Sequence, residues 1–283
     1  MSTRSTDSAR PRRQALSAEG ISKTFGNSAS AHRVLRDVDL RIEPGEFVCI
    51  VGPSGAGKTT LLRALSGLAV PSTGTVRLGD RVVTEPQAEI GVVFQDYRGS
   101  LMPWMRVCDN VAFPLEGRGV PRRERRSRAE EALTSVGLAD VGRKYPWQLS
   151  GGMQQRVAIA RGLAYESSIL VMDEPFGSVD AQTRFELEDL TLALRARFGI
   201  TIIVVTHDID EAVYLSDRVV VLSGKPATVV ETVDVGLGGE RDQLLTRAEP
   251  EFTRLRTHIL GRIRGDGAPE RATKVESAAL GSE

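Results

Sequence analysis

The hydrophobic residues of this chain gather in short, mostly apolar runs that are separated by longer segments of helical character. The runs cover Phe47 to Val51, Ile90 to Phe94, Ile169 to Met172, Thr201 to Val205 and Arg218 to Leu222. A strand whose successive residues are all apolar is covered on both faces, as in a parallel sheet between layers of helices. The pattern therefore predicts an α/β fold with a largely parallel central sheet.

Between the runs, the pattern predicts helices at Lys58 to Leu68, about Arg122 to Val136, Gly152 to Ala164, Ala181 to Arg197 and Ile209 to Ser216. No strong strand signal occurs between Gln95 and about Glu166, which favours a mainly helical insert over about residues 96–166. Residues 15–25, 32–42 and 73–83 alternate more regularly between apolar and polar positions and are split by turn residues. They predict antiparallel strands in the N-terminal part.

The ends of the chain differ from this central pattern. Residues 1–15 are read as a disordered extension and residues 16–235 as one domain. Residues 236–264 form a short C-terminal helical tail, in which Phe252, Leu255 and Ile259 share one helix face. Residues 265–283 are polar and are predicted to be disordered.

Composition narrows the class of protein only slightly. The 283 residues are 41% hydrophobic and 26% charged, with a formal net charge of zero, so nothing in the balance indicates nucleic acid as a partner. No apolar run approaches the about 20 residues that span a bilayer, and the Arg-rich start lacks the apolar core of a secretion signal. Cys49 and Cys108 make neither a disulfide framework nor a metal site, which favours a reducing cytosol.

The stretch GPSGAGKT matches the phosphate-binding loop G-x-x-x-x-G-K-[ST] in full, between a predicted strand and a predicted helix. Its glycines allow backbone N–H groups to close on a β-phosphate, Lys58 brings a charge to the β- and γ-phosphates, and the Thr59 hydroxyl can ligate Mg²⁺. Thr60 can reach the α-phosphate. The alternative is a glycine turn that only joins strand to helix. The candidate phosphate ligands are Gly52, Pro53, Ser54, Gly55, Ala56, Gly57, Lys58, Thr59 and Thr60.

Polar side chains follow three of the predicted strands. Asp173 and Glu174 end the run ILVMDE, where Asp173 would hold Mg²⁺ and Glu174 would orient or deprotonate a water. Gln95 could reach the metal and the water, and His207 could donate to the γ-phosphate. Each residue alone could be an ordinary polar strand end. Because parallel strands bring their carboxyl ends to one edge, we expect the group to lie near Lys58.

A second stretch, LSGGMQQR from Leu149 to Arg156, also resembles an anion-binding helix start. Together with GPSGAGKT, the glutamine of VFQD, ILVMDEP, SVD and the histidine of VTHD, it resembles the ATP-binding-cassette (ABC) ATPases in order and rough spacing, from about Leu16 to Val235. The resemblance implies a cassette with a RecA-like core and a homodimer in which each ATP lies between two subunits. The γ-phosphate would contact Ser150, Gly151 and Gly152 in trans, and Asp180 of SVD would link the two sites.

The same resemblance places Phe25 of SKTFG where the family stacks an aromatic on adenine, although tyrosine is commoner there. A buried core phenylalanine is the alternative. SVD also departs from the frequent A-L-D.

Residues Gln95 to Leu115, with LMPW at Leu101 to Trp104, resemble the importer ATPases for nitrate, sulfonate, taurine and bicarbonate. This implies ATP and Mg²⁺ as cofactors, two transmembrane permease subunits, a solute-binding protein acting indirectly, and a peripheral position at the cytoplasmic face of the cell membrane. Tyr97, Met102 and Trp104 would receive a permease helix, unless they pack inside the insert. A soluble non-transport ABC ATPase or an exporter ATPase is the alternative function, and the transported solute cannot be read from this chain.

Five arginines between Arg122 and Arg128 could suggest nucleic-acid binding. Glu124, Glu130 and Glu131 are interleaved with them and no aromatic residue is present for base stacking, so a solvated helix face is the better interpretation.

Overall fold

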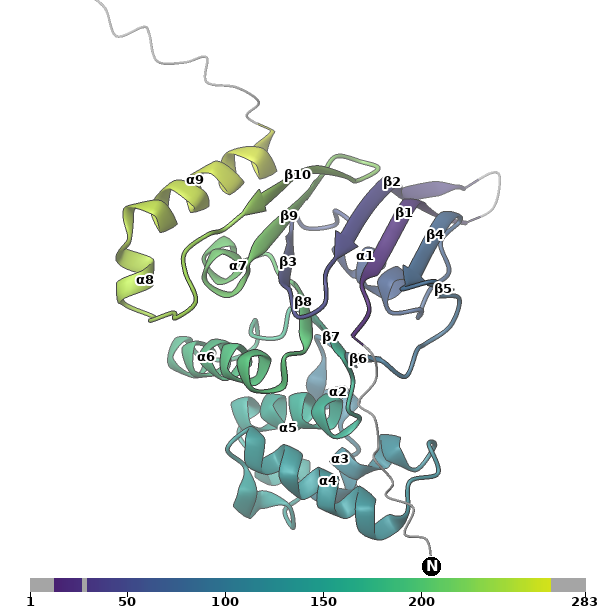
Figure 1. Cartoon of the computed structure of the whole chain (residues 1–283), viewed down its shortest axis with the longest axis vertical. Helices are drawn as coiled ribbons and strands as arrows, with labels where there is room; N and C mark the ends of the chain where they lie inside the picture. Colours follow the sequence, from purple (N-terminus) through teal and green to yellow (C-terminus); the bar gives the residue numbers. More distant parts are fainter. Residues whose placement is uncertain (1–12, 27–29, 266–283) are drawn as a thin grey trace, which may run out of the picture.

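The computed structural model describes residues 13–26 and 30–265 of the chain. These residues form a mixed α/β fold with two sheets, and most of the helices that follow the strands lie on one side of the larger sheet (Figure 1). Of the two segments predicted to be disordered, residues 1–15 and 265–283, only residues 13–15 and Gly265 fall within the described part. No helix of the described residues is long and apolar enough to cross a bilayer.

The larger sheet has six strands in the order β10-β9-β3-β8-β7-β6. All neighbouring pairs are parallel except β10 with β9. Every residue of β3, β7 and β8 is buried, which agrees with the uninterrupted apolar runs. The strands are β3 (Phe47–Val51), β6 (Ile90–Val93), β7 (Ile169–Asp173), β8 (Thr201–Val205), β9 (Arg218–Ser223) and β10 (Thr228–Asp234).

Alternation along these strands divides the core in two. Phe47, Cys49 and Val51 of β3 pack on one face, whereas Val48 and Ile50 pack on the other, because successive side chains of a strand point to opposite faces. The second face packs against α1 (Lys58–Leu65), which lies between the larger sheet and a four-stranded antiparallel sheet. That smaller sheet consists of β2 (His32–Ile42), β1 (Leu16–Phe25), β4 (Thr73–Leu78) and β5 (Arg81–Val82), as the alternating N-terminal segments predict.

No strand lies between β6 and β7 in the described chain, and the helices of this region gather at one end of the molecule (Figure 1). One of these helices carries the five arginines between Arg122 and Arg128. Three of them form ion pairs with glutamates, as expected of a solvated helix face: Arg125 with Glu116, Arg126 with Glu130 and Arg128 with Glu124. The helices are α2 (Tyr97–Ser100), α3 (Val107–Ala112), η1 (Phe113–Leu115), α4 (Arg122–Ser135), η2 (Ala139–Val141), η3 (Pro146–Gln148) and α5 (Gly151–Ala164).

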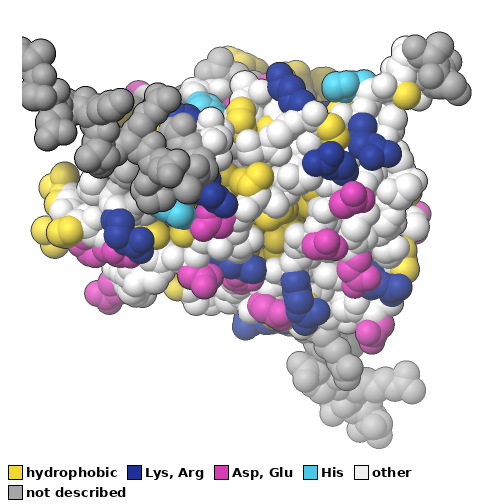
Figure 2. Space-filling model, turned by 90° about the horizontal axis from the view of Figure 1, so that it is seen from above, with side chains coloured by type: hydrophobic (Ala, Val, Ile, Leu, Met, Phe, Trp, Pro, Cys, Tyr) yellow, Lys and Arg dark blue, Asp and Glu magenta, His cyan; other side chains and the backbone are white. Residues whose placement is uncertain are grey.

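The C-terminal part packs back on the larger core. In α9 (Pro250–Arg264) the predicted face of Phe252, Leu255 and Ile259 is buried there. The other helices of this part are α6 (Ala181–Phe198), α7 (Ile209–Leu215) and α8 (Leu245–Ala248). Figure 2 shows that the face seen from above carries interspersed basic and acidic side chains.

Two element ends differ from the expectation. Helix α1 ends at Leu65 rather than Leu68, because the Ser66 hydroxyl donates to the Leu62 carbonyl (2.9 Å) and Gly67 turns left-handed at φ 74°. Strand β6 ends at Val93, and Phe94 is 42% exposed beyond it.

Candidate functional site

The phosphate-binding loop joins β3 to α1 and is shaped by its glycines. Gly55 and Gly57 have φ values of 77° and 78°, which L-amino acids with a side chain rarely adopt. A Cβ at Gly57 would lie 2.7 Å from Cγ1 of Val34, so the loop closes tightly against β2. The loop residues predicted from Gly52 to Thr60 are thus brought together at the carboxyl end of a central strand.

Lys58 is buried and folds back onto this loop. Its Nζ donates to the carbonyls of Gly52 (2.9 Å) and Pro53 (3.1 Å). Burial lowers the pKa of the Lys58 ammonium, and the nearby carboxylates of Glu174 and Asp173 act in the opposite direction. A bound phosphate would supply the anion that this desolvated cation lacks.

Asp173 closes β7 beside the first turn of α1. The Thr59 hydroxyl donates to its Oδ1 at 3.3 Å, so the loop and the strand end meet at the pair predicted to hold Mg²⁺. Burial is the main cause that raises the pKa of Asp173, and the Thr59 hydrogen bond opposes it.

Glu174 lies where the carboxyl ends of β6, β7 and β8 come together. Its N–H still donates to the Val205 carbonyl of β8 at 2.8 Å, and its left-handed backbone (φ 43°) then turns the chain out of the strand. Gln95 Nε2 donates to Glu174 Oε2 at 3.2 Å, and Nδ1 of His207 lies 3.2 Å from the same oxygen. The structure therefore brings Gln95, Glu174 and His207 together, as the sequence predicts.

The stretch LSGGMQQR from Leu149 to Arg156, called the signature segment from here on, and Asp180 lie at the starts of neighbouring helices outside this cluster. Ser150 caps α5 by accepting from the Met153 N–H (3.3 Å), and Asp180 caps α6 by accepting from the N–H and hydroxyl of Thr183 (3.0 and 2.7 Å). These bonds from Thr183 lower the pKa of Asp180. A Cβ at Gly152 would lie 2.4 Å from Cγ2 of Thr183, so the two helix starts touch. Within the described residues, no hydrogen bond or ion pair joins Ser150 or Asp180 to the phosphate loop.

Two aromatic predictions are resolved by exposure. Phe25 is 48% exposed at the end of β1, with Lys23 Nζ 5.3 Å from its ring centroid, so the alternative of a core phenylalanine is wrong. Trp104 is 75% exposed on the insert, so it does not pack inside it, whereas Met102 is partly buried. The side chain of Tyr97 lies outside the described structure.

An aromatic site that the sequence interpretation missed precedes the signature. Trp147 is 69% exposed and stacks on Tyr145, with ring centroids 6.0 Å apart and an interplanar angle of 11°. The aromatic pair in YPWQ, directly before the signature, is the sequence signal that could have indicated it.

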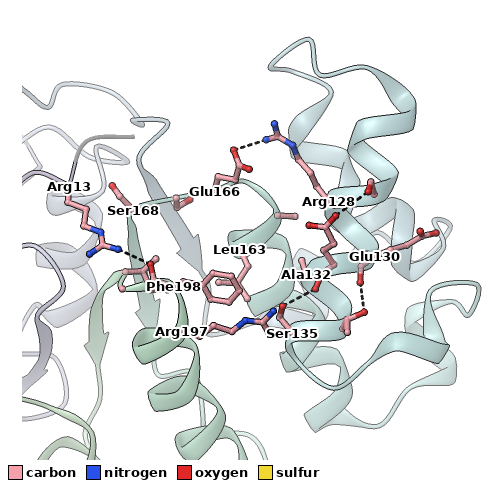
Figure 3. A pocket seen from close by; sticks show the side chains of 17 residues that line it. Arg13, Arg128, Glu130, Ala132, Ser135, Leu163, Glu166, Ser168, Arg197 and Phe198 are labelled. Carbon is pink, nitrogen blue, oxygen red and sulfur yellow. Dashed lines mark hydrogen bonds and ion pairs between the residues drawn. The ribbon is translucent and has the colours of Figure 1, made fainter. Parts of the chain in front are cut away.

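A cavity of about 480 Å³ opens elsewhere, between α4 and the C-terminal ends of α5 and α6 (Figure 3). Both basic and acidic side chains line the cavity. Arg128 forms an ion pair with Glu166 (2.8 Å), and Arg13 donates a hydrogen bond to the Phe198 carbonyl (3.2 Å). None of the predicted site residues lines it.

The chain is similar to known proteins over most of its length. A family model described as "ABC transporter" matches residues 35–177. The taurine import ATP-binding protein TauB of Chromobacterium violaceum is 43% identical, over 88% of this chain and 95% of the relative. The nitrate import ATP-binding protein NrtD of Synechocystis is 41% identical, with the same shares covered.

Among solved structures, a dimeric ATP-binding cassette in a post-hydrolysis state with ADP and Pi is 33% identical, with a TM-score of 0.69, over 78% of this chain and 98% of that one. The chain belongs to the ATP-binding subunits of ABC transporters. Within that family its relatives place it in the importer group, so the family's ATP binding and transport-coupled ATPase activity apply to it rather than the soluble or exporter alternative.

Proposed function

We propose that this chain hydrolyses ATP to energise uptake of a small anion such as nitrate, a sulfonate or taurine through a separate permease. The observation that carries the proposal is the convergence of Gln95 and His207 on one oxygen of Glu174, beside the pair of Asp173 and Thr59. The class of solute rests on the relatives named for taurine and nitrate import.

In this proposal the phosphate loop binds ATP, with Lys58 at the β- and γ-phosphates and Phe25 stacked on adenine. Three side chains supply hard oxygen donors of the kind that fit Mg²⁺: the hydroxyl of Thr59, the carboxylate of Asp173 and the amide oxygen of Gln95. No cluster of three His, Cys, Asp or Glu ligands occurs in the part of the chain that the structure describes. A magnesium shell at this site would therefore be completed by phosphate oxygens and water, and the ion would neutralise charge on the phosphates.

Glu174 acts as the base that orients or deprotonates the attacking water, and His207 donates to the γ-phosphate. Glu174 suits the role because Gln95 and His207 both hold the same carboxylate oxygen, which fixes the side chain in one position.

The working unit is a homodimer of cassettes. Ser150, Gly151 and Gly152 of one subunit contact the γ-phosphate bound by the other, and Asp180 links the two sites. Support comes from the start of α5, which Ser150 caps. Backbone N–H groups in the first turn of a helix favour an anion, and this anion can be the γ-phosphate bound by the phosphate loop of the other subunit.

Two permease subunits, supplied by a solute-binding protein, complete the complex at the cytoplasmic face of the cell membrane. The exposed Trp104 on the insert supports a permease contact there, because exposed aromatic residues are typical anchors of interfaces. Co-purification of a Trp104→Asp variant with the permease tests this contact, and full retention of the permease would contradict it.

The replacement Glu174→Gln tests the catalytic assignment. It should leave ATP affinity close to that of the wild type and lower turnover about a hundredfold or more, because the amide cannot accept the proton of water. Lys58→Ala is the contrasting variant and should weaken ATP binding itself. Steady-state turnover of Glu174→Gln within about threefold of the wild type would remove Glu174 from the role of base.

A further inference from the structure

An ion pair joins α6 to the loop that carries His207. Arg184 of α6 donates from Nη1 to Oδ2 of Asp208 at 3.0 Å, and both side chains are about two-thirds buried, with exposed fractions of 31% and 32%. The Nε of Arg184 is buried and has no partner among the described residues. The guanidinium therefore keeps a desolvated donor unsatisfied while it bonds to Asp208, and this costs stability.

Each end of this pair is continuous with a loop of the nucleotide site. Arg184 lies one helical turn after Asp180, and its backbone N–H donates to the Asp180 carbonyl at 2.9 Å. Asp208 directly follows His207 and caps α7 by accepting from the Glu211 N–H at 3.1 Å. Its own N–H donates to the Thr206 hydroxyl at 3.0 Å. One hydrogen-bonded path thus leads from Asp180 to the residues on both sides of His207.

His207 needs such support because its side chain is largely exposed. The imidazole is 63% exposed, and among residues 13–26 and 30–265 its side-chain partner is Glu174, with Nδ1 3.2 Å from Oε2. Its position therefore depends on the backbone of residues 206–208. A displacement of a catalytic group by about 1 Å can cost about a hundredfold in rate.

We propose that Arg184 is a positioning residue, which couples the start of α6 at Asp180 to the placement of His207 against Glu174. This inference rests on the proposed function and adds a means of regulation to it. A partner subunit that moves Asp180 when the dimer closes moves His207 through the Arg184–Asp208 pair. Hydrolysis then depends on contact between the subunits as well as on bound ATP.

Asp208→Asn and Arg184→Gln test the coupling in the full-length purified protein. Asparagine keeps an oxygen that caps α7 and removes only the carboxylate that pairs with Arg184. Each variant should lower kcat about tenfold, with KM for ATP within about twofold of the wild type, because the phosphate loop is untouched. The double variant should be no slower than either single variant, since both remove one interaction. Arg184→Lys should recover part of the rate because it keeps the charge.

Arg195→Gln is the matched control. Arg195 lies on the same helix and forms an ion pair with Asp217, away from His207, with exposed fractions of 27% and 43%. The Arg195→Gln variant should lose about as much thermal stability as Arg184→Gln and should keep the wild-type kcat. Circular dichroism and thermal melts of all variants confirm that each one folds.

Equal loss of kcat in Arg184→Gln and Arg195→Gln would overturn the positioning role, and so would additive losses in the double variant. A wild-type protein that binds but does not hydrolyse ATP, or a fully active Glu174→Gln variant, would instead overturn the proposed function and the coupling with it.

Discussion

Two charged residues of the candidate site, Asp173 and Lys58, are almost completely buried. Asp173 is 6% exposed and Lys58 is 7% exposed, although charged side chains are rarely so buried unless they are paired. Lys58 donates to two backbone carbonyls, and Asp173 accepts from the Thr59 hydroxyl. Burial of the Asp173 carboxyl group, with the Thr59 hydroxyl as its side-chain partner, therefore costs stability.

Asp173→Asn should raise the melting temperature of the nucleotide-free protein at neutral pH, although it should abolish hydrolysis. Because burial raises the pKa of Asp173 above its value in the unfolded chain, the folded state disfavours the ionised carboxyl. The wild-type protein then loses stability as pH rises through that raised pKa. The gain from asparagine should shrink as pH falls towards about 4, where the ordinary aspartate also becomes protonated. Scanning calorimetry across this pH range measures it, and a gain that grows on acidification would contradict the explanation.

Several site residues could be predicted individually because each stands one or two residues after an apolar run. Gln95, Glu174 and His207 are of this kind, and a parallel sheet places the carboxyl ends of its strands on one edge. Arg184 and Asp208 could not be paired in this way, since they lie 24 residues apart on separate elements. The aspartate after His207, directly before a helical pattern, indicates a helix cap but does not indicate its arginine partner.

Helices α5 and α6 show how packing between elements sets the site. Gly152 and Thr183 meet where both helices begin, so the spacing between Ser150 and Asp180 depends on the absence of a side chain at Gly152. Thr183 cannot turn its methyl group away freely, because its hydroxyl is bonded to Asp180 at 2.7 Å.

Gly152→Ala should therefore destabilise the protein despite the better helix propensity of alanine. Alanine favours the helix by about 1 kcal/mol, whereas overpacking costs about 1–3 kcal/mol, so a net loss of about 1 kcal/mol is expected. Thr183→Ser removes the methyl group and keeps the hydroxyl. The double variant Gly152→Ala/Thr183→Ser should then be at least as stable as the wild type. Urea unfolding measures all three variants, and a double variant that is no better than Gly152→Ala would show that the close contact is not the cause.

At the scale of the whole molecule, one chain carries two segments that the sequence predicts to bind phosphate, and within the described residues no hydrogen bond or ion pair joins Ser150 of the second to the first. The phosphate loop lies at the carboxyl end of the central strand β3, and the start of α5 lies beside the start of α6. A second copy of the chain completes the site in our proposal.

A heterodimer separates the cis and trans contributions. Lys58→Ala in one subunit with Ser150→Arg in the other places both defects in one composite site and leaves the second site intact. Both changes in the same subunit damage both sites. The first arrangement should retain about half of the wild-type ATP occupancy. The second should retain much less, because one of its sites lacks Lys58 and the other lacks Ser150 as a phosphate contact. Equilibrium binding of labelled ATP compares the two, and equal occupancy would contradict the trans contact.

The sequence by itself determined the strands of the parallel sheet, the phosphate loop and the strand ends that carry Asp173, Glu174 and His207. These are properties of neighbouring residues: an unbroken apolar run needs cover on both faces, and glycines at fixed spacing allow the loop to close. Tertiary structure alone decided the contacts between residues that no motif or apolar run connects. Glu188 of α6 is fully buried and accepts at 2.7 Å from Arg247, 59 residues later in the chain. The exposure of Phe25 and Trp104 likewise depended on which elements pack beside them. Local patterns specify elements, whereas contacts between distant elements depend on how those elements pack, and packing is not a property of any single segment.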